Sequence, residues 1–125
     1  MGRLQPELLD RVVSFGDCFV RRAEHLSESG KSRRVVDQII AAATSVGANT
    51  YEADEALSRA DFAKCVGIVL KELNECRFWI ALVERRSWAT PAQLAELAAE
   101  TTELKRLFGA ILTRTRKSSK QANPK

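Results

Sequence analysis

The chain has 125 residues, of which 45% are hydrophobic and 29% are charged, and its formal net charge is +4. This length allows one domain with a core of its own, and the composition is that of an ordinary globular protein. No apolar run approaches the roughly 20 residues of a membrane span and no signal peptide opens the chain, so we expect a soluble, cytoplasmic protein without a membrane partner.

The first predicted helix runs from about Pro6 to Leu26, after a frayed start at residues 1–5. Its apolar stripe follows helical spacing and contains Leu8, Val12, Phe15 and Phe19. Proline suits the first turn of a helix, where its missing N–H costs nothing. The run Ser27-Glu28-Ser29-Gly30 is typical of a helix stop followed by a turn.

The second predicted helix runs from near Ser32 to about Ala56. Its inward positions are Val36, Ile39 or Ile40, Ala43, Val46 and Thr50. Gly47 and Gly67 each lie ten residues from Leu57, on either side of it. In an antiparallel hairpin folded at Leu57 these glycines would lie at one level and let the two backbones approach closely.

The third helix is predicted to start at a capping signal, Ser58-Arg59-Ala60-Asp61, and to run to about Arg85. Its apolar residues follow an alternating four-three spacing, which is typical of a bundle helix that packs along its whole length. They are Phe62, Val66, Val69, Leu73, Cys76, Ile80 and Val83.

The fourth helix has the clearest start signal, because Thr90-Pro91-Ala92-Gln93 combines an N-cap, a first-turn proline and a glutamine partner. A seam then runs to about Thr113 and contains Leu94, Leu97, Thr101, Leu104, Phe108 and Ile111. Residues 114–125 have no apolar residue except Ala122 and are expected to form a disordered basic tail.

With breaks near residues 28–32, 57–60 and 86–90, the pattern predicts an all-α, antiparallel up-down-up-down four-helix bundle over residues 1–113. The charge is uneven along it. Seven basic residues and no acid follow Glu103, from Lys105 to Lys125. The remainder holds thirteen basic residues against sixteen acidic ones, a formal charge of −3, so the positive charge is a C-terminal feature.

A run of short motifs spans residues 44 to 76: Thr44-Ser45-Val46-Gly47-Ala48-Asn49, Glu52-Ala53, Ser58-Arg59, Asp61-Phe62, and Leu70-Lys71-Glu72 with Glu75. In order and spacing they resemble the small four-helix-bundle proteins encoded by intervening sequences in bacterial 23S rRNA genes. The resemblance extends over about residues 5 to 115. This chain departs from the family pattern at Thr50-Tyr51 and at Asp54-Glu55, which makes the turn more acidic.

The resemblance implies a homo-oligomer, typically a pentameric ring, whose activity is largely undefined. A relative in diversity-generating retroelements is a basic pentameric accessory protein that works with a reverse transcriptase and nucleic acid. That likeness is one of fold, and the rest of this chain outside the basic C-terminal run is acidic.

Five polar residues lie nearest the predicted seam: Asn49, Glu52, Lys71, Glu72 and Glu75. They could form a polar pocket between helices. The interpretation that we favour is a hydrogen-bonded network that fixes the bundle register or a subunit contact, as buried polar groups often do.

The sequence favours a protein that is not an enzyme, and we expect no catalytic residues, no metal and no cofactor. Cys18, Cys65 and Cys76 form no CxxC pair, and His25 is the single histidine that could join them in a metal site. A di-metal carboxylate site would need Glu-x-x-His pairs on two helices, which are missing. No histidine lies near a plausible nucleophile, and no phosphate-binding glycine loop is present. An odd number of thiols fits a reducing cytoplasm.

Basic pairs and clusters are predicted to meet at one end of the antiparallel bundle: Arg21, Arg22, Lys31, Arg33, Arg34, Arg85 and Arg86. Two functions from different classes follow. One is a non-catalytic oligomeric interaction or scaffold module. The alternative is an accessory protein that binds RNA or DNA through this basic surface, which a ring would repeat by symmetry.

Overall fold

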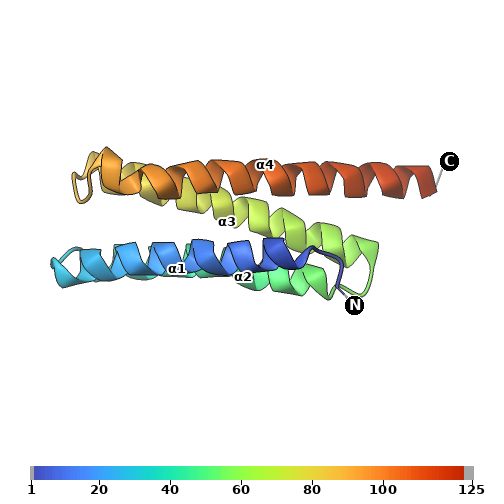
Figure 1. The fold of residues 1–125 in the computed structure, drawn as a ribbon, viewed down its shortest axis with the longest axis horizontal. Coiled ribbons are helices and arrows are strands. Elements are labelled where there is room, and N and C mark those ends of the chain that lie inside the picture. The colour runs from blue at the N-terminus through green and yellow to red at the C-terminus, as the bar shows by residue number, and fades with distance from the viewer. Residues whose placement is uncertain (1, 123–125) are drawn as a thin grey trace.

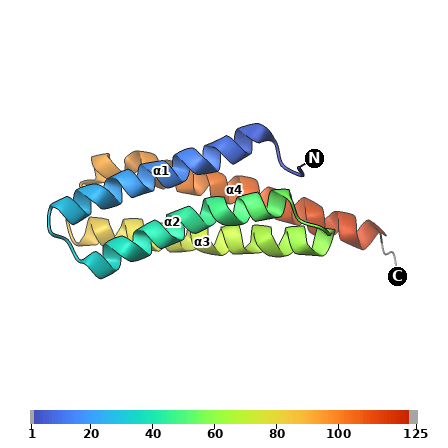
Figure 2. The ribbon, with the colours of Figure 1, turned by 90° about the horizontal axis from the view of Figure 1, so that it is seen from below.

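The computed structural model describes residues 2–122, which fold into four α-helices and contain no strand. The helices are α1 (Pro6–Glu28), α2 (Arg33–Asp54), α3 (Arg59–Arg85) and α4 (Pro91–Ala122). Successive helices run in opposite directions, so that each connection reverses the chain at one end of the bundle (Figure 1, Figure 2). The predicted all-α antiparallel bundle and its three breaks are therefore confirmed.

The helix starts carry the side-chain caps that their sequences predict. The Ser58 hydroxyl accepts the backbone N–H of Asp61 at 3.1 Å. Thr90 and Gln93 form a complete capping box, in which each side chain accepts the other's backbone N–H, at 3.1 and 2.8 Å. Gly30 follows α1 with φ of 75°, a left-handed conformation that costs glycine little.

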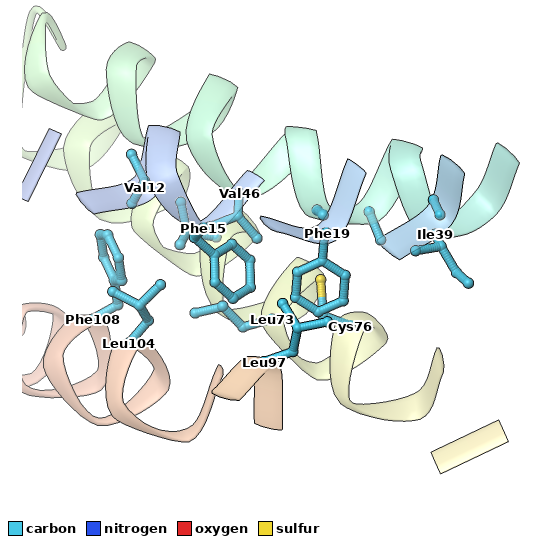
Figure 3. Close-up of a cluster of buried hydrophobic side chains, with 14 of the residues drawn as sticks. Val12, Phe15, Phe19, Ile39, Val46, Leu73, Cys76, Leu97, Leu104 and Phe108 are labelled. Atoms are coloured by element: carbon cyan, nitrogen blue, oxygen red, sulfur yellow. The ribbon is translucent and has the colours of Figure 1, made fainter. Parts of the chain in front are cut away.

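The core is formed by the predicted seams of all four helices. Phe15 and Phe19 of α1 pack against each other with tilted rings at a centroid distance of 4.9 Å. Both point toward Leu73 and Cys76 of α3 and Leu97 of α4 (Figure 3). All of these side chains are buried. Of the seven predicted seam positions on α3, only Ile80 is partly exposed. On α4 the seam ends on Leu112 rather than Ile111, which is half-buried.

Helices that follow one another in the sequence make most of the contacts between elements. α2 packs against both α1 and α3, and α3 packs against α4. The contact between α1 and α4 is the smallest of those between neighbouring helices. None of the helices in residues 2–122 combines the length and apolar character that crossing a membrane requires.

The expected close approach of Gly47 and Gly67 is wrong. A Cβ added at Gly47 would lie 3.7 Å from the carbonyl oxygen of Val12 on α1, and one added at Gly67 would meet nothing within 4 Å. Gly47 follows the buried Val46 by one position, which rotates it away from the core stripe and toward α1. Gly47 therefore lies against α1 rather than against α3.

The predicted fraying of residues 1–5 is wrong for Arg3 and Leu4. The backbone N–H of Arg3 donates to the carbonyl oxygen of Asp54 at 3.0 Å, and that of Leu4 donates to the Asp54 carboxylate at 2.7 Å. The Arg3 side chain also donates to the carbonyl oxygen of Ala56 at 3.0 Å. The two bonds from Arg3 satisfy carbonyl groups at and just after the end of α2, where carbonyls lack helical partners.

The expected disorder after residue 113 is also wrong as far as Ala122, because these residues continue α4. No glycine or proline lies between Gly109 and Pro124, and arginine, lysine and glutamine are good helix formers. α4 consequently runs past the other helices at its C-terminal end (Figure 1, Figure 2). Residues 123–125 of the predicted tail lie outside the described residues.

Candidate interaction surfaces

The topology brings the predicted basic residues to one end of the bundle. The last turns of α1, the first turn of α2 and the end of α3 lie together there (Figure 1, Figure 2). We call the set Arg21, Arg22, Lys31, Arg33, Arg34, Arg85 and Arg86 the basic end. Arg22 and Lys31 are half-buried and the other five are exposed.

Most residues of the basic end form no ion pair within the described part of the chain. In the part of the chain that the structure describes, only Arg21 of this set forms an ion pair, with Asp17 at 2.5 Å. The guanidinium of Arg86 lies 5.7 Å from the ring centroid of Trp88, a cation–π contact. Arg33 and Arg34 occupy the first turn of α2, which has no acidic residue, although the helix dipole disfavours positive charge there. This unfavourable placement fits a surface that meets anions.

The structure does not join the five predicted polar residues into a network. Asn49 donates to the carbonyl oxygen of Ser45 on its own helix at 2.9 Å, and Glu75 accepts the indole N–H of Trp79 at 3.1 Å. Glu52 and Lys71 are exposed. Among the described side chains, no hydrogen bond or ion pair connects any two of the five. A pocket or a subunit contact formed by these residues stays a prediction.

Glu72 is the member of this set whose environment is most unusual. Burial raises the pKa of its carboxyl group, the nearby charge of Glu75 raises it further, and Lys71 opposes the change. Burial also raises the pKa of the Cys76 thiol to about 12, with smaller contributions from Glu72 and Glu75. A thiol held protonated in this way is a poor nucleophile and a poor metal ligand. In residues 2–122 no three histidine, cysteine or acidic side chains gather in a way that could hold a metal ion.

Two apolar surfaces lie outside the core. On the α1–α2 face, Val13 is 52% exposed and Tyr51 is 48% exposed, beside a shallow groove that contains Gly16 and Gly47. On α3, Phe78 is 56% exposed and packs edge-to-face on Trp79 at a centroid distance of 4.9 Å. Five further apolar residues of α3 outside its core seam are half-buried: Cys65, Ile68, Leu70, Trp79 and Leu82.

A groove between the start of α1 and the end of α4 was not predicted from the sequence. It has a volume of about 730 Å³. Its apolar lining includes Leu4, Leu8, Phe62, Leu107 and Ile111, and four arginines line it as well: Arg3, Arg11, Arg106 and Arg114. We call it the arginine groove. The only signal in the sequence was the excess of basic residues after Glu103, which did not show that Arg3, before α1, and Arg11, in α1, would join them.

The molecule is thus an all-helical bundle with an apolar core, and its polar chemistry lies on its surface. Residues 11–110 match the family model of the 23S rRNA-intervening sequence protein, and the chain belongs to this family. It is similar to a crystal structure of a protein of unknown function from the S23 ribosomal protein family of Bacteroides thetaiotaomicron. The two share 34% identity with a TM-score of 0.80, over 83% of this chain and 96% of that one. No curated protein matches the sequence.

Proposed function

We propose that the protein is a non-catalytic interaction module that works as a homo-oligomer in the cytoplasm. The observation that carries this proposal is the pair of apolar surfaces on different helices, around Val13 and Tyr51 and around Phe78. Large apolar side chains gathered on a surface often mark a contact between proteins. The three free cysteines, one buried and two half-buried, favour a reducing compartment.

Two different surfaces on one protomer suit a heterologous contact, in which one surface of each copy meets the other surface of the next. Such contacts close into rings when the rotation between copies permits. The resemblance described above supports five copies as the ring size.

The test is a light-scattering mass at micromolar concentration, set against the 13.9 kDa of one chain. Phe78→Glu and Val13→Glu should each lower the mass by dissociating the ring, because a charge would have to be buried in the contact. Both side chains are exposed in the protomer, so the helical circular dichroism should not change. Thr102→Glu, at an exposed position of α4, is the control. A wild-type mass near 14 kDa would refute the proposal.

The basic end favours a second candidate function, the binding of RNA or DNA through phosphate contacts. Its support is the placement of Arg33 and Arg34 at the start of α2 without an acidic neighbour in that turn. Without a groove-reading motif, binding should be weakly sequence-selective and should be lost as salt rises.

Retention of RNA or DNA at about 50 mM salt, where phosphate contacts are strongest, tests this candidate. The double variant Arg33→Glu/Arg34→Glu should weaken binding and flatten its salt dependence. Arg59→Glu/Lys64→Glu makes the same change in charge near the opposite end of the bundle and should have a smaller effect. If the wild-type protein retains no nucleic acid at this salt concentration, the basic end is a solvated surface.

A further inference from the structure

The turn between α2 and α3 presents a leucine to solvent. Leu57 is 94% exposed, although the burial of a leucine side chain is favourable. The turn is acidic, because Glu52, Asp54, Glu55 and Asp61 all lie within five residues of Leu57, against one basic residue, Arg59. We call Leu57 and these acids the acidic turn. A single exposed leucine needs no explanation by itself, but this one lies beside a groove of complementary character.

The arginine groove has the opposite character to the acidic turn. Its apolar lining offers a site for an aliphatic side chain, while Arg3 and Arg114 line it with positive charge against one acid, Glu7. Arg11 and Arg106 are paired with Glu100 and Glu103. Arg114 is exposed, and in the described part of the chain it forms no ion pair. A leucine flanked by carboxylates therefore matches this groove in both its apolar and its charged parts.

The groove and the turn are next to each other at the same end of the bundle. Arg3, which lines the groove, donates to the carbonyl oxygen of Ala56 in the turn and lies 5.8 Å from the ring centroid of Phe62. Two adjacent and complementary patches cannot meet within one rigid protomer. A twofold axis that passes between them places each patch against its counterpart on a second copy.

We propose that two copies of this chain meet end to end across such an axis, with Leu57 of each copy inserted into the arginine groove of the other. The part of α4 that extends beyond the bundle would then run beside the acidic turn of the second copy (Figure 1). Arg114 in the groove, and Arg116 and Lys117 after it, are all exposed and would lie opposite Glu52 and Glu55. The contact is isologous, so it adds two apolar insertions and two sets of charge pairs for each pair of copies.

This contact is separate from the oligomer proposed above. The lateral surfaces are on the α1–α2 face and on α3 around Phe78, whereas the end contact uses the α2–α3 turn and the ends of α1 and α4. A protein with both contacts would have a mass of twice the ring. A protein with only the end contact would be a dimer that Phe78→Glu does not dissociate.

The first test is the effect of Leu57 on the light-scattering mass across a dilution series. Leu57→Glu should weaken the end contact at least about tenfold and so halve the mass, because it removes the buried leucine and adds a charge. Leu57→Met keeps an apolar side chain of similar size and should retain the mass. Leu57 is almost fully exposed in the protomer, so neither change should disturb the fold.

The second test uses opposite charge reversals on the two sides of the contact. Glu55→Lys alone and Arg114→Glu alone each create two mismatched contacts, so each variant should fail to pair with itself. An equimolar mixture should pair again, because one contact is then native and the other is reversed on both sides. The paired mass should also fall as salt rises.

Three outcomes would overturn the proposal. The first is a mass that Leu57→Glu leaves unchanged. The second is a wild-type mass that corresponds to an odd number of copies. The third is a mixture of the two charge variants that pairs no better than either variant alone. If Phe78→Glu lowers the light-scattering mass and Leu57→Glu does not, the lateral oligomer is supported and the end contact is refuted.

Discussion

Arg11 of α1 and Glu100 of α4 form a two-pronged ion pair in which both nitrogen–oxygen distances are 2.7 Å. The pair links α1 to α4, whose contact is the smallest between neighbouring helices of the bundle. The hydrogen bonds to Glu100 raise the pKa of Arg11 above its ordinary value. The side chains are only 37% and 29% exposed, so solvent screens the pair less than it screens the other ion pairs of the chain.

We expect this pair to stabilise the attachment of α1 to α4 by about 1 kcal/mol. Arg11→Ala and Glu100→Ala should each lower the urea midpoint, and the double variant should cost less than the sum of the two single variants. Arg106 and Glu103 form an exposed pair within α4 and serve as the control cycle, with a smaller coupling energy. A coupling energy for Arg11 and Glu100 no larger than that of the control would contradict this expectation.

Gly67→Ala should stabilise the protein by about 0.5–1 kcal/mol. Gly67 lies within α3, where glycine is destabilising relative to alanine, and its added Cβ would meet nothing within 4 Å. Gly47→Ala should gain less, because its Cβ would lie in ordinary contact 3.7 Å from the Val12 carbonyl oxygen. Urea unfolding at one fixed protein concentration measures both changes. A loss of stability in Gly67→Ala would show that α3 needs this space.

Cys76 should resist alkylation in the native protein. Burial excludes the reagent, and with a pKa of about 12 only roughly one thiol in 10⁵ is ionised at pH 7. In native buffer, iodoacetamide should modify Cys76 at least about 100-fold more slowly than in urea, where the chain is unfolded. Mass spectrometry of the peptides reads each site separately, and the half-buried Cys18 and Cys65 provide internal comparison. Equal rates for Cys76 in native buffer and in urea would disprove the predicted packing.

Glu72→Gln should stabilise the protein at neutral pH and have little effect in acid. The pKa of Glu72 is raised in the folded state. Its contribution to the free energy of unfolding is therefore fully present below the pKa that Glu72 has in the unfolded chain, and is lost as the pH rises through its folded-state pKa. Glutamine removes that penalty at pH 7 and changes little near pH 3, where the wild-type carboxyl is protonated. Urea midpoints at the two pH values check the sign, with the exposed Glu84→Gln as a matched change of charge. If the stabilisation by Glu72→Gln grew toward low pH, the pKa of Glu72 would have to be lowered in the folded state, not raised.

The fold could be predicted because each helix has both an apolar stripe and an end signal that act locally. The capping box of Thr90 and Gln93 and the four-three spacing from Phe62 to Val83 need no knowledge of the rest of the chain. The basic end could be predicted as well, because antiparallel topology alone decides which helix ends meet.

Contacts that depend on the rotation of one helix relative to another could not be predicted. An apolar stripe shows which face is buried, but not which neighbour lies beside each flank, so Gly47 was expected to face α3 and instead faces α1. Arg11 and Glu100 are far apart in the sequence, and nothing local marks them as partners. The continuation of α4 was missed because a polar composition was interpreted as disorder, although the segment contains no helix breaker before Pro124.

The small contact between α1 and α4 also bears on how the chain reaches this structure. Since the extensive packing occurs between helices joined by short turns, most contacting residues are close in sequence, and relative contact order is low. Helical bundles of this kind fold in microseconds to milliseconds. The outer helices α1 and α4 can dock last on a central α2–α3 hairpin, without closing a long loop first. Newly made chains would then expose the apolar faces of this hairpin only briefly before they are covered.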